Sequence, residues 1–140
     1  MNAVETTDRS QTQSLSFRLD LPHPPEKVWR ALTEPALLSE WLLPVMQGDV
    51  AAGEFALQIP QEQEWGSTVH CRVVEIETHR RLTYTWVAGE LDTVVTFALT
   101  ASDTGTRLLL EQSGFRPGQG RFFGGARRGW QQMGERLGEL

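Results

Sequence analysis

His70, Arg72, Tyr84 and Gln112 are the side chains of this sequence best suited to chemistry inside an apolar interior. His70 and Arg72 lie two residues apart on a predicted strand, so both point to one face. If that face lies inward, the pair forms an acid/base or anion site; if it lies outward, both side chains are solvated. Tyr84 and His70 together would supply the two titratable groups that a cyclase/aromatase-like or hydrolytic enzyme needs.

The register of residues 69–76 decides between these alternatives. Val69, Cys71 and Val73 favour one inward face, whereas Val74 and Ile76 favour the other. A β-bulge within the strand would reconcile the two halves. The sequence leaves the orientation of His70 and Arg72 open.

Gln112 follows Leu108 and Leu110 on the same face of another predicted strand. An amide can orient a ligand, but it does not transfer protons at neutral pH. We therefore consider Gln112 either a ligand contact or a simple strand-end residue, and no catalytic residue is predicted.

Neither a metal nor a cofactor is predicted. The three histidines and Cys71 lack a chelating spacing, and no nucleotide-binding or nucleophile-elbow motif occurs. The net charge of −5 argues against nucleic acid as a partner, and no apolar run is long enough for a membrane span. A single cysteine excludes an intramolecular disulfide, so stability must come from the core. The N-terminal segment has no apolar signal core, and we expect a cytoplasmic protein, either a monomer or a homodimer.

The elements that position these residues follow from hydrophobic period and from proline. Residues 1–13 are polar and are expected to form a flexible tail, followed by one domain at 14–140. Prolines mark the boundaries of two short predicted helices, 24–33 and 35–42. Apolar steps of three and four predict a long helix over 123–140. Alternating segments predict strands at 14–21, 54–60, 68–77, 81–87, 93–100 and 106–112, and short links between the later ones predict an antiparallel meander.

One amphipathic helix cannot cover a long curved sheet completely, so a space should remain between them. The sequence has five tryptophans, and large side chains would fill or line that space. We expect Trp29 to be structural, wedging the first short helix against the sheet and the final helix. Trp41 is expected near the mouth of the space.

Four segments carry a resemblance to a known family: "PPEKVWRALTEPALLSEWL" at 24–42, "VEIETHRRLTYTW" at 74–86, "GTRLLLEQSGF" at 105–115 and "GWQQMGERL" at 129–137. In this order they resemble the START-like superfamily, also called SRPBCC or Bet v 1-like. Within it they are most similar to the family named for the activator of the heat-shock chaperone ATPase. The resemblance implies an α+β helix-grip fold, with an antiparallel sheet of about six to seven strands wrapped on the C-terminal helix.

The resemblance also implies a hydrophobic cavity between sheet and helix. The leading interpretation is binding of a small hydrophobic molecule, aromatic or polyketide-like, without catalysis. A co-chaperone-like or stress-response interaction and an enzyme acting in the cavity are the alternatives. The predicted ligand contacts are Leu38, Trp41, Phe55, Trp65, Tyr84, Trp86, Phe97, Leu110, Gln112, Phe123, Trp130 and Met133.

Overall fold

A seven-stranded antiparallel sheet forms the body of the protein, with strand order β1-β7-β6-β5-β4-β3-β2. The computed structural model describes residues 13–59 and 68–139. The strands are β1 (Gln13–Leu21), β2 (Val45–Asp49), β3 (Glu54–Gln58), β4 (Thr68–Glu77), β5 (Arg81–Ala88), β6 (Leu91–Ser102) and β7 (Gly105–Phe115). Strands β2 to β7 form the expected meander, and β1 closes the far edge beside β7.

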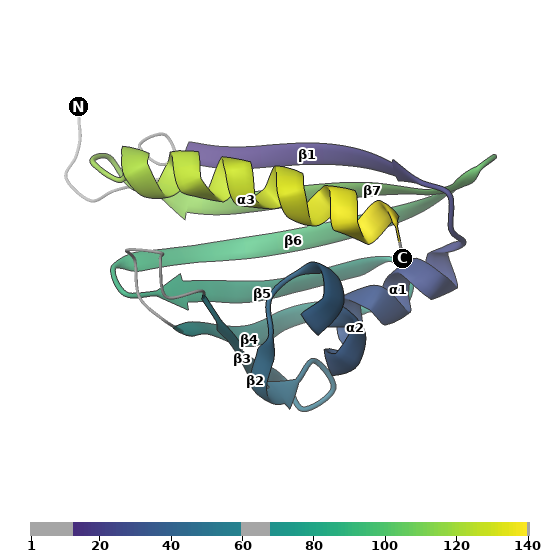
Figure 1. Cartoon of the computed structure of the whole chain (residues 1–140), viewed down its shortest axis with the longest axis horizontal. Helices are drawn as coiled ribbons and strands as arrows, with labels where there is room; N and C mark the ends of the chain where they lie inside the picture. Colours follow the sequence, from purple (N-terminus) through teal and green to yellow (C-terminus); the bar gives the residue numbers. More distant parts are fainter. Residues whose placement is uncertain (1–12, 60–67, 140) are drawn as a thin grey trace.

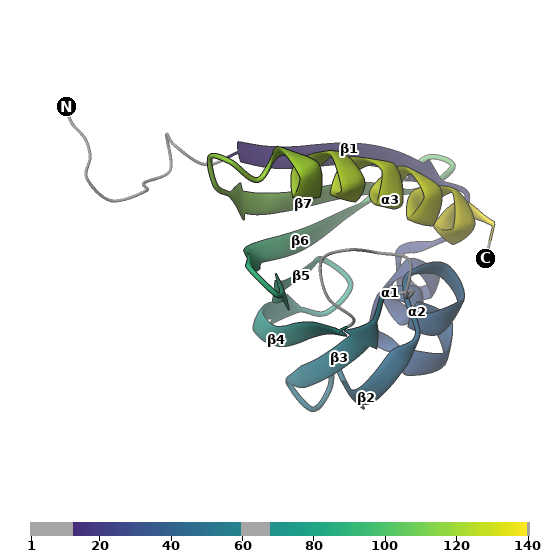
Figure 2. The ribbon, with the colours of Figure 1, turned by 60° about the vertical axis from the view of Figure 1, so that its left-hand side comes forward.

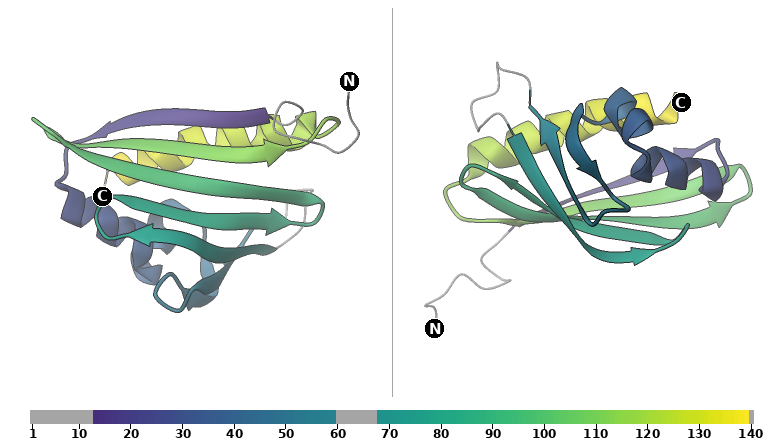
Figure 3. Two further views of the ribbon diagram at one scale, coloured as in Figure 1. Left: turned by 180° about the vertical axis from the view of Figure 1, so that it is seen from behind. Right: turned by 90° about the horizontal axis from the view of Figure 1, so that it is seen from below.

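Three helices complete the fold, and all three lie on one face of the sheet (Figures 1 and 3). They are α1 (Pro25–Thr33), α2 (Pro35–Trp41) and α3 (Gly120–Gly138). Proline occupies the first turn of both short helices. The N–H groups of a first turn have no partner within the helix, so the missing N–H of proline costs no hydrogen bond there. Figure 2 shows the sheet curving away from α3, with α1 and α2 near the C-terminal end of that helix. The helix-grip arrangement is thereby confirmed.

Helix α3 approaches β1 closely because it carries a small residue at the contact. A methyl group added to Gly134 would meet the side chain of Leu19 at 3.3 Å. The buried residues of α3 follow the predicted steps of three and four: Ala126, Trp130, Met133 and Leu137. Tertiary packing of this face offsets the low helix propensity of the glycines.

Strand β4 contains a β-bulge, which was the predicted way to reconcile the different inward faces of its two halves. The register shifts between Val73 and Glu75, so that Val73 pairs with Tyr84 and Ile76 pairs with Leu82. Tyr84 and Leu82 share the buried face of β5. Val73 and Ile76 therefore point to the same side of the sheet although they are three residues apart. The extra residue, Val74, is exposed, so the alternative that turned it inward is wrong, and Ile76 is itself 50% exposed.

Several element boundaries differ from expectation. Strand β1 begins at Gln13, which shortens the predicted tail, and the rest of that tail lies outside the described residues. Helix α3 begins at Gly120, before the first apolar step at Phe123. No strand was predicted at the position of β2, because its mostly exposed residues show no alternation of apolar and polar side chains.

Candidate functional site

A cavity of about 260 Å³ lies between α3 and the buried face of the sheet. Helix α3 lines one side with small and flexible residues, and β5 and β7 line the other. The lining residues are Leu43, Ile59, Trp86, Gln112, Gly125, Ala126, Gly129, Trp130, Gln132, Met133 and Arg136. Four predicted ligand contacts, Trp86, Gln112, Trp130 and Met133, therefore meet at this cavity.

The other predicted contacts do not line the cavity. Leu38, Trp41, Phe55, Tyr84, Phe97 and Leu110 are buried in the core. Phe123 is half-buried on the first turns of α3, edge-on to Phe115 at 5.2 Å between ring centroids. Trp65 lies outside the described residues.

Aromatic rings fill much of the space that the fold leaves between helix and sheet. Phe97 is at the centre, with centroid distances of 6.3 Å to Trp41, 5.8 Å to Tyr84 and 6.1 Å to Trp130. The contacts with Trp41 and Trp130 are edge-to-face, an arrangement that aromatic pairs prefer, and the contact with Tyr84 is tilted. Open volume is left on the other side of Trp130, where its ring faces Trp86 at a centroid distance of 5.3 Å.

A chain of buried hydrogen bonds holds this tryptophan pair. The indole N–H of Trp130 donates to Gln112 Oε1 at 2.7 Å. Gln112 Nε2 donates to Thr93 Oγ1 at 2.8 Å, and the Thr93 hydroxyl donates to the carbonyl of Trp86 at 2.8 Å. Gln112 thus links α3 to β6 and β5 from within β7. It is an interior residue that positions Trp130, and not a strand-end residue, because β7 continues to Phe115.

Tyr84 and Cys71 are the buried titratable groups of the interior. Burial raises the pKa of the Cys71 thiol to about 12. Burial, and secondarily the nearby Cys71 thiolate charge, raise the pKa of Tyr84 well above its ordinary value. Both groups are therefore protonated at neutral pH, and a buried thiol of this kind is unreactive. The Tyr84 hydroxyl has no hydrogen-bond partner among the described residues.

His70 and Arg72 lie on the opposite face of the sheet from Tyr84, and both are exposed. There they border an open groove with Thr85 and Val87. The inward alternative for the His70–Arg72 pair is therefore wrong, because β4 turns Val69 and Cys71 inward before its bulge. The two titratable groups that the enzyme alternative requires do not meet. Within residues 13–59 and 68–139, no three His, Cys, Asp or Glu side chains are grouped as a metal site.

The two tryptophans of the short helices are both core residues. Trp41 is only 1% exposed, and its indole N–H donates to the carbonyl of Ala31 at 2.8 Å. The expected position of Trp41 near the cavity mouth is wrong, because this bond and the contact with Phe97 hold its ring deep between α1 and the sheet.

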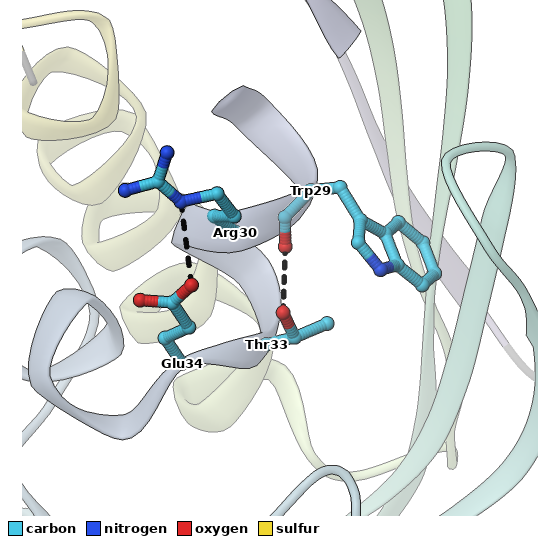
Figure 4. Close-up of polar contacts among 4 residues, drawn as sticks. All are labelled: Trp29, Arg30, Thr33 and Glu34. Atoms are coloured by element: carbon cyan, nitrogen blue, oxygen red, sulfur yellow. Dashed lines mark hydrogen bonds and ion pairs between the residues drawn. The ribbon is translucent and has the colours of Figure 1, made fainter. Parts of the chain in front are cut away.

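Trp29 points from α1 toward the strands (Figure 4) and lies edge-on to His79, 6.1 Å between centroids, in the β4–β5 turn. Its own carbonyl accepts a bond from the Thr33 hydroxyl at 2.9 Å. The ion pair of Arg30 with Glu34 lies on the exposed side of the same helix. Trp29 therefore fixes α1 on the sheet, as expected of a structural residue.

A protein-family model described as "Activator of Hsp90 ATPase homolog 1-like protein" matches residues 22–140. The chain belongs to this family. Comparison with curated proteins gave no match. In the part of this family member that the structure describes, no helix is both long and apolar enough to cross a lipid bilayer.

Solved structures similar to this Activator of Hsp90 ATPase homolog 1-like chain include protein MLL2253 from Mesorhizobium loti. It is 42% identical, with a TM-score of 0.81 over 91% of this chain and 95% of that chain. CalU16 from Micromonospora echinospora is 23% identical, with a TM-score of 0.69 over 90% and 76%. DynU16, a protein in the dynemicin biosynthetic locus, is 22% identical, with a TM-score of 0.72 over 90% and 46%. The last two share the fold alone.

Sequence reasoning missed several residues that border the cavity in this family member. Leu43 follows α2 in a segment without a regular period, and Ile59 was expected on one face of the predicted strand 54–60 but not at a ligand site. Gly125, Gly129, Gln132 and Arg136 lie on the predicted long helix, but none of them was predicted as a ligand contact. A signal for them exists in retrospect: Gly125 and Gly129, like Gln132 and Arg136, are four residues apart, which places the members of each pair on one helix face.

Proposed function

We propose that this protein binds a small hydrophobic molecule in the cavity between α3 and the sheet. The observation that supports the proposal is the lining of that cavity. It combines the Trp86–Trp130 pair with aliphatic side chains and with two glycines of α3. Ligand sites in proteins typically combine such an apolar lining with a few oriented polar groups.

The size of the cavity limits the ligand. An apolar protein cavity of about 150 Å³ accepts benzene, and drug-sized molecules occupy pockets of roughly 300–1,000 Å³. A volume of about 260 Å³ lies between these cases. The proposed ligand therefore has one ring or two fused rings.

The lining residues have distinct roles in the proposal. Trp130 and Trp86 offer ring faces and edges for stacking. The bond to Gln112 fixes the Trp130 indole, and the Thr93 hydroxyl holds the main chain of Trp86. Met133 is flexible and can adapt to the outline of a ligand. Gln112 keeps one amide hydrogen for the ligand, since it has two and the Thr93 bond uses one. Leu38, Trp41, Phe55, Tyr84, Phe97 and Leu110 are buried in the core outside the cavity lining, and their contact with a ligand stays a prediction.

The test is a titration of the ¹⁵N-labelled protein with 2-naphthol, observed at the indole N–H resonances. We expect the Trp130 and Trp86 signals to move in a saturable way at sub-millimolar ligand. Trp29 serves as the internal control, because its ring packs on the β4–β5 turn, away from the cavity lining. Equal movement of the Trp29 signal, or no movement up to the solubility limit, would contradict the proposal.

Chaperone binding is the second candidate function, favoured by the description of the matching family model. Its test is the ATPase rate of the Hsp90 chaperone with and without an excess of this protein. An unchanged rate, with no complex seen in analytical ultracentrifugation, would exclude it.

A further inference from the structure

Arg136 is the one charged side chain that lines the cavity within the described part of the chain. Its neighbours in the lining are aromatic, aliphatic, glycine or amide residues. Arg136 is itself exposed, so its guanidinium lies at the rim of the cavity, where solvent screens part of its charge. A cation at the rim still favours an anionic group on a ligand whose apolar part enters the cavity.

The orientation of Arg136 leaves its recognition atoms available. Its Nε donates to the carbonyl of Trp41 at 3.2 Å, which fixes the base of the guanidinium against the end of α2. The two Nη groups remain, and no carboxylate of residues 13–59 or 68–139 lies within ion-pair distance of Arg136. Gln132, one turn earlier on α3, places a second N–H donor beside the same side of the cavity.

We propose that the ligand is an aromatic carboxylate, with its ring against Trp130 and its carboxylate bound by Arg136. The inference rests on the proposed function and specifies the ligand class of that same site. A guanidinium presents a planar fork of donors that matches the two oxygens of a carboxylate. The cavity volume leaves room for one or two rings below such a group.

The test compares two probes of nearly identical shape, 2-naphthoate and the neutral 2-naphthamide, by calorimetry at pH 7.5. The wild-type protein should bind 2-naphthoate about tenfold more tightly, which corresponds to about 1.4 kcal/mol. Arg136→Gln should remove this preference, because it should lower the affinity for 2-naphthoate much more than the affinity for 2-naphthamide. Arg136→Lys keeps the charge without the fork and should keep only part of the preference.

The matched control is Arg127→Gln, which removes an exposed arginine of α3 that does not line the cavity. It should retain the full preference for 2-naphthoate, so that a loss in Arg136→Gln cannot come from net charge alone. The comparison of the two probes on wild-type protein requires no variant to fold.

The outcomes separate this inference from the proposed function. Equal affinity of the wild-type protein for both probes overturns the carboxylate inference and leaves the cavity as a ligand site. Equal weakening of the binding of both probes by Arg136→Gln also overturns it, since Arg136 then only supports Trp41 at the end of α2. If neither probe binds the wild-type protein, the proposed function itself fails and the inference fails with it.

Discussion

Gly129 offers the sharpest test of the cavity, because one substitution should change stability and binding in opposite directions. A methyl group at Gly129 would meet only Met133 Cε, at 3.5 Å, which is ordinary van der Waals contact. Gly129→Ala therefore fits without strain. Since glycine within a helix is less favourable than alanine by about 0.5–1 kcal/mol, we expect the free energy of unfolding to rise by that amount.

The same methyl group should weaken ligand binding. Gly129 lines the cavity, so the added carbon takes space that a ligand carbon would occupy. Burial of one CH₂ contributes about 0.8 kcal/mol, which corresponds to roughly a fourfold loss of affinity for 2-naphthol. Gly124→Ala is the control, because no atom lies within 4 Å of its added Cβ and Gly124 does not line the cavity.

Urea unfolding measures the stability of both variants, and calorimetry measures their affinity for 2-naphthol. Both variants should be stabilised, and only Gly129→Ala should bind more weakly. Unchanged or tighter binding by Gly129→Ala would refute the assignment of the site. Destabilisation by Gly129→Ala would mean that α3 lies closer to its neighbours than the contacts of Gly129 indicate.

Three further substitutions test the interior. Trp41→Ala should lower the free energy of unfolding by about 3–5 kcal/mol in urea titrations, and a cost below 2 kcal/mol would contradict its place in the core. Tyr84→Phe should stabilise the protein by about 1 kcal/mol, since it removes a buried hydroxyl without a partner among the described residues; a loss of stability would reveal a partner. Because the pKa of the Cys71 thiol is about 12 in the folded protein and 9.0 ordinarily, the unfolded chain releases this proton first, and stability should fall as pH rises from 9 to 12. Urea titrations across this pH range should show a smaller fall in the free energy of unfolding for Cys71→Ala than for the wild-type protein, and almost none for Cys71→Ala/Tyr84→Phe. An equal fall in the wild-type protein and both variants would show that other groups cause the pH dependence.

The sequence predicts those parts of the fold that depend on local patterns, namely the position of proline and the period of the apolar residues. Proline in the first turn located α1 and α2, and alternation located β5, β6 and β7. The sheet edge at β2 could not be found in this way, because an edge strand with mostly exposed residues has no apolar face to mark it.

The candidate site depends on contacts that no local pattern encodes. Trp41 was expected at the cavity mouth because the sequence does not reveal that its N–H reaches the carbonyl of Ala31. Gln112 was seen as inward-facing, but its partners come from β6 and α3, which join it only after the sheet forms. The cavity itself is the volume that the packed side chains leave unfilled, so its lining cannot be predicted residue by residue.

The pairing of β1 with β7 sets the order in which the protein can assemble during translation. Leu15 pairs with Gln112, so β1 has no partner in the sheet until β7, far later in the sequence, has been made. Until then, Leu15, Phe17, Leu19 and Leu21 form an apolar strand without a covering layer. Contacts so distant in sequence are slow to form, and an unpaired strand of this kind is prone to intermolecular association. Pairing of β1 with β7 is therefore expected to be a late step of folding.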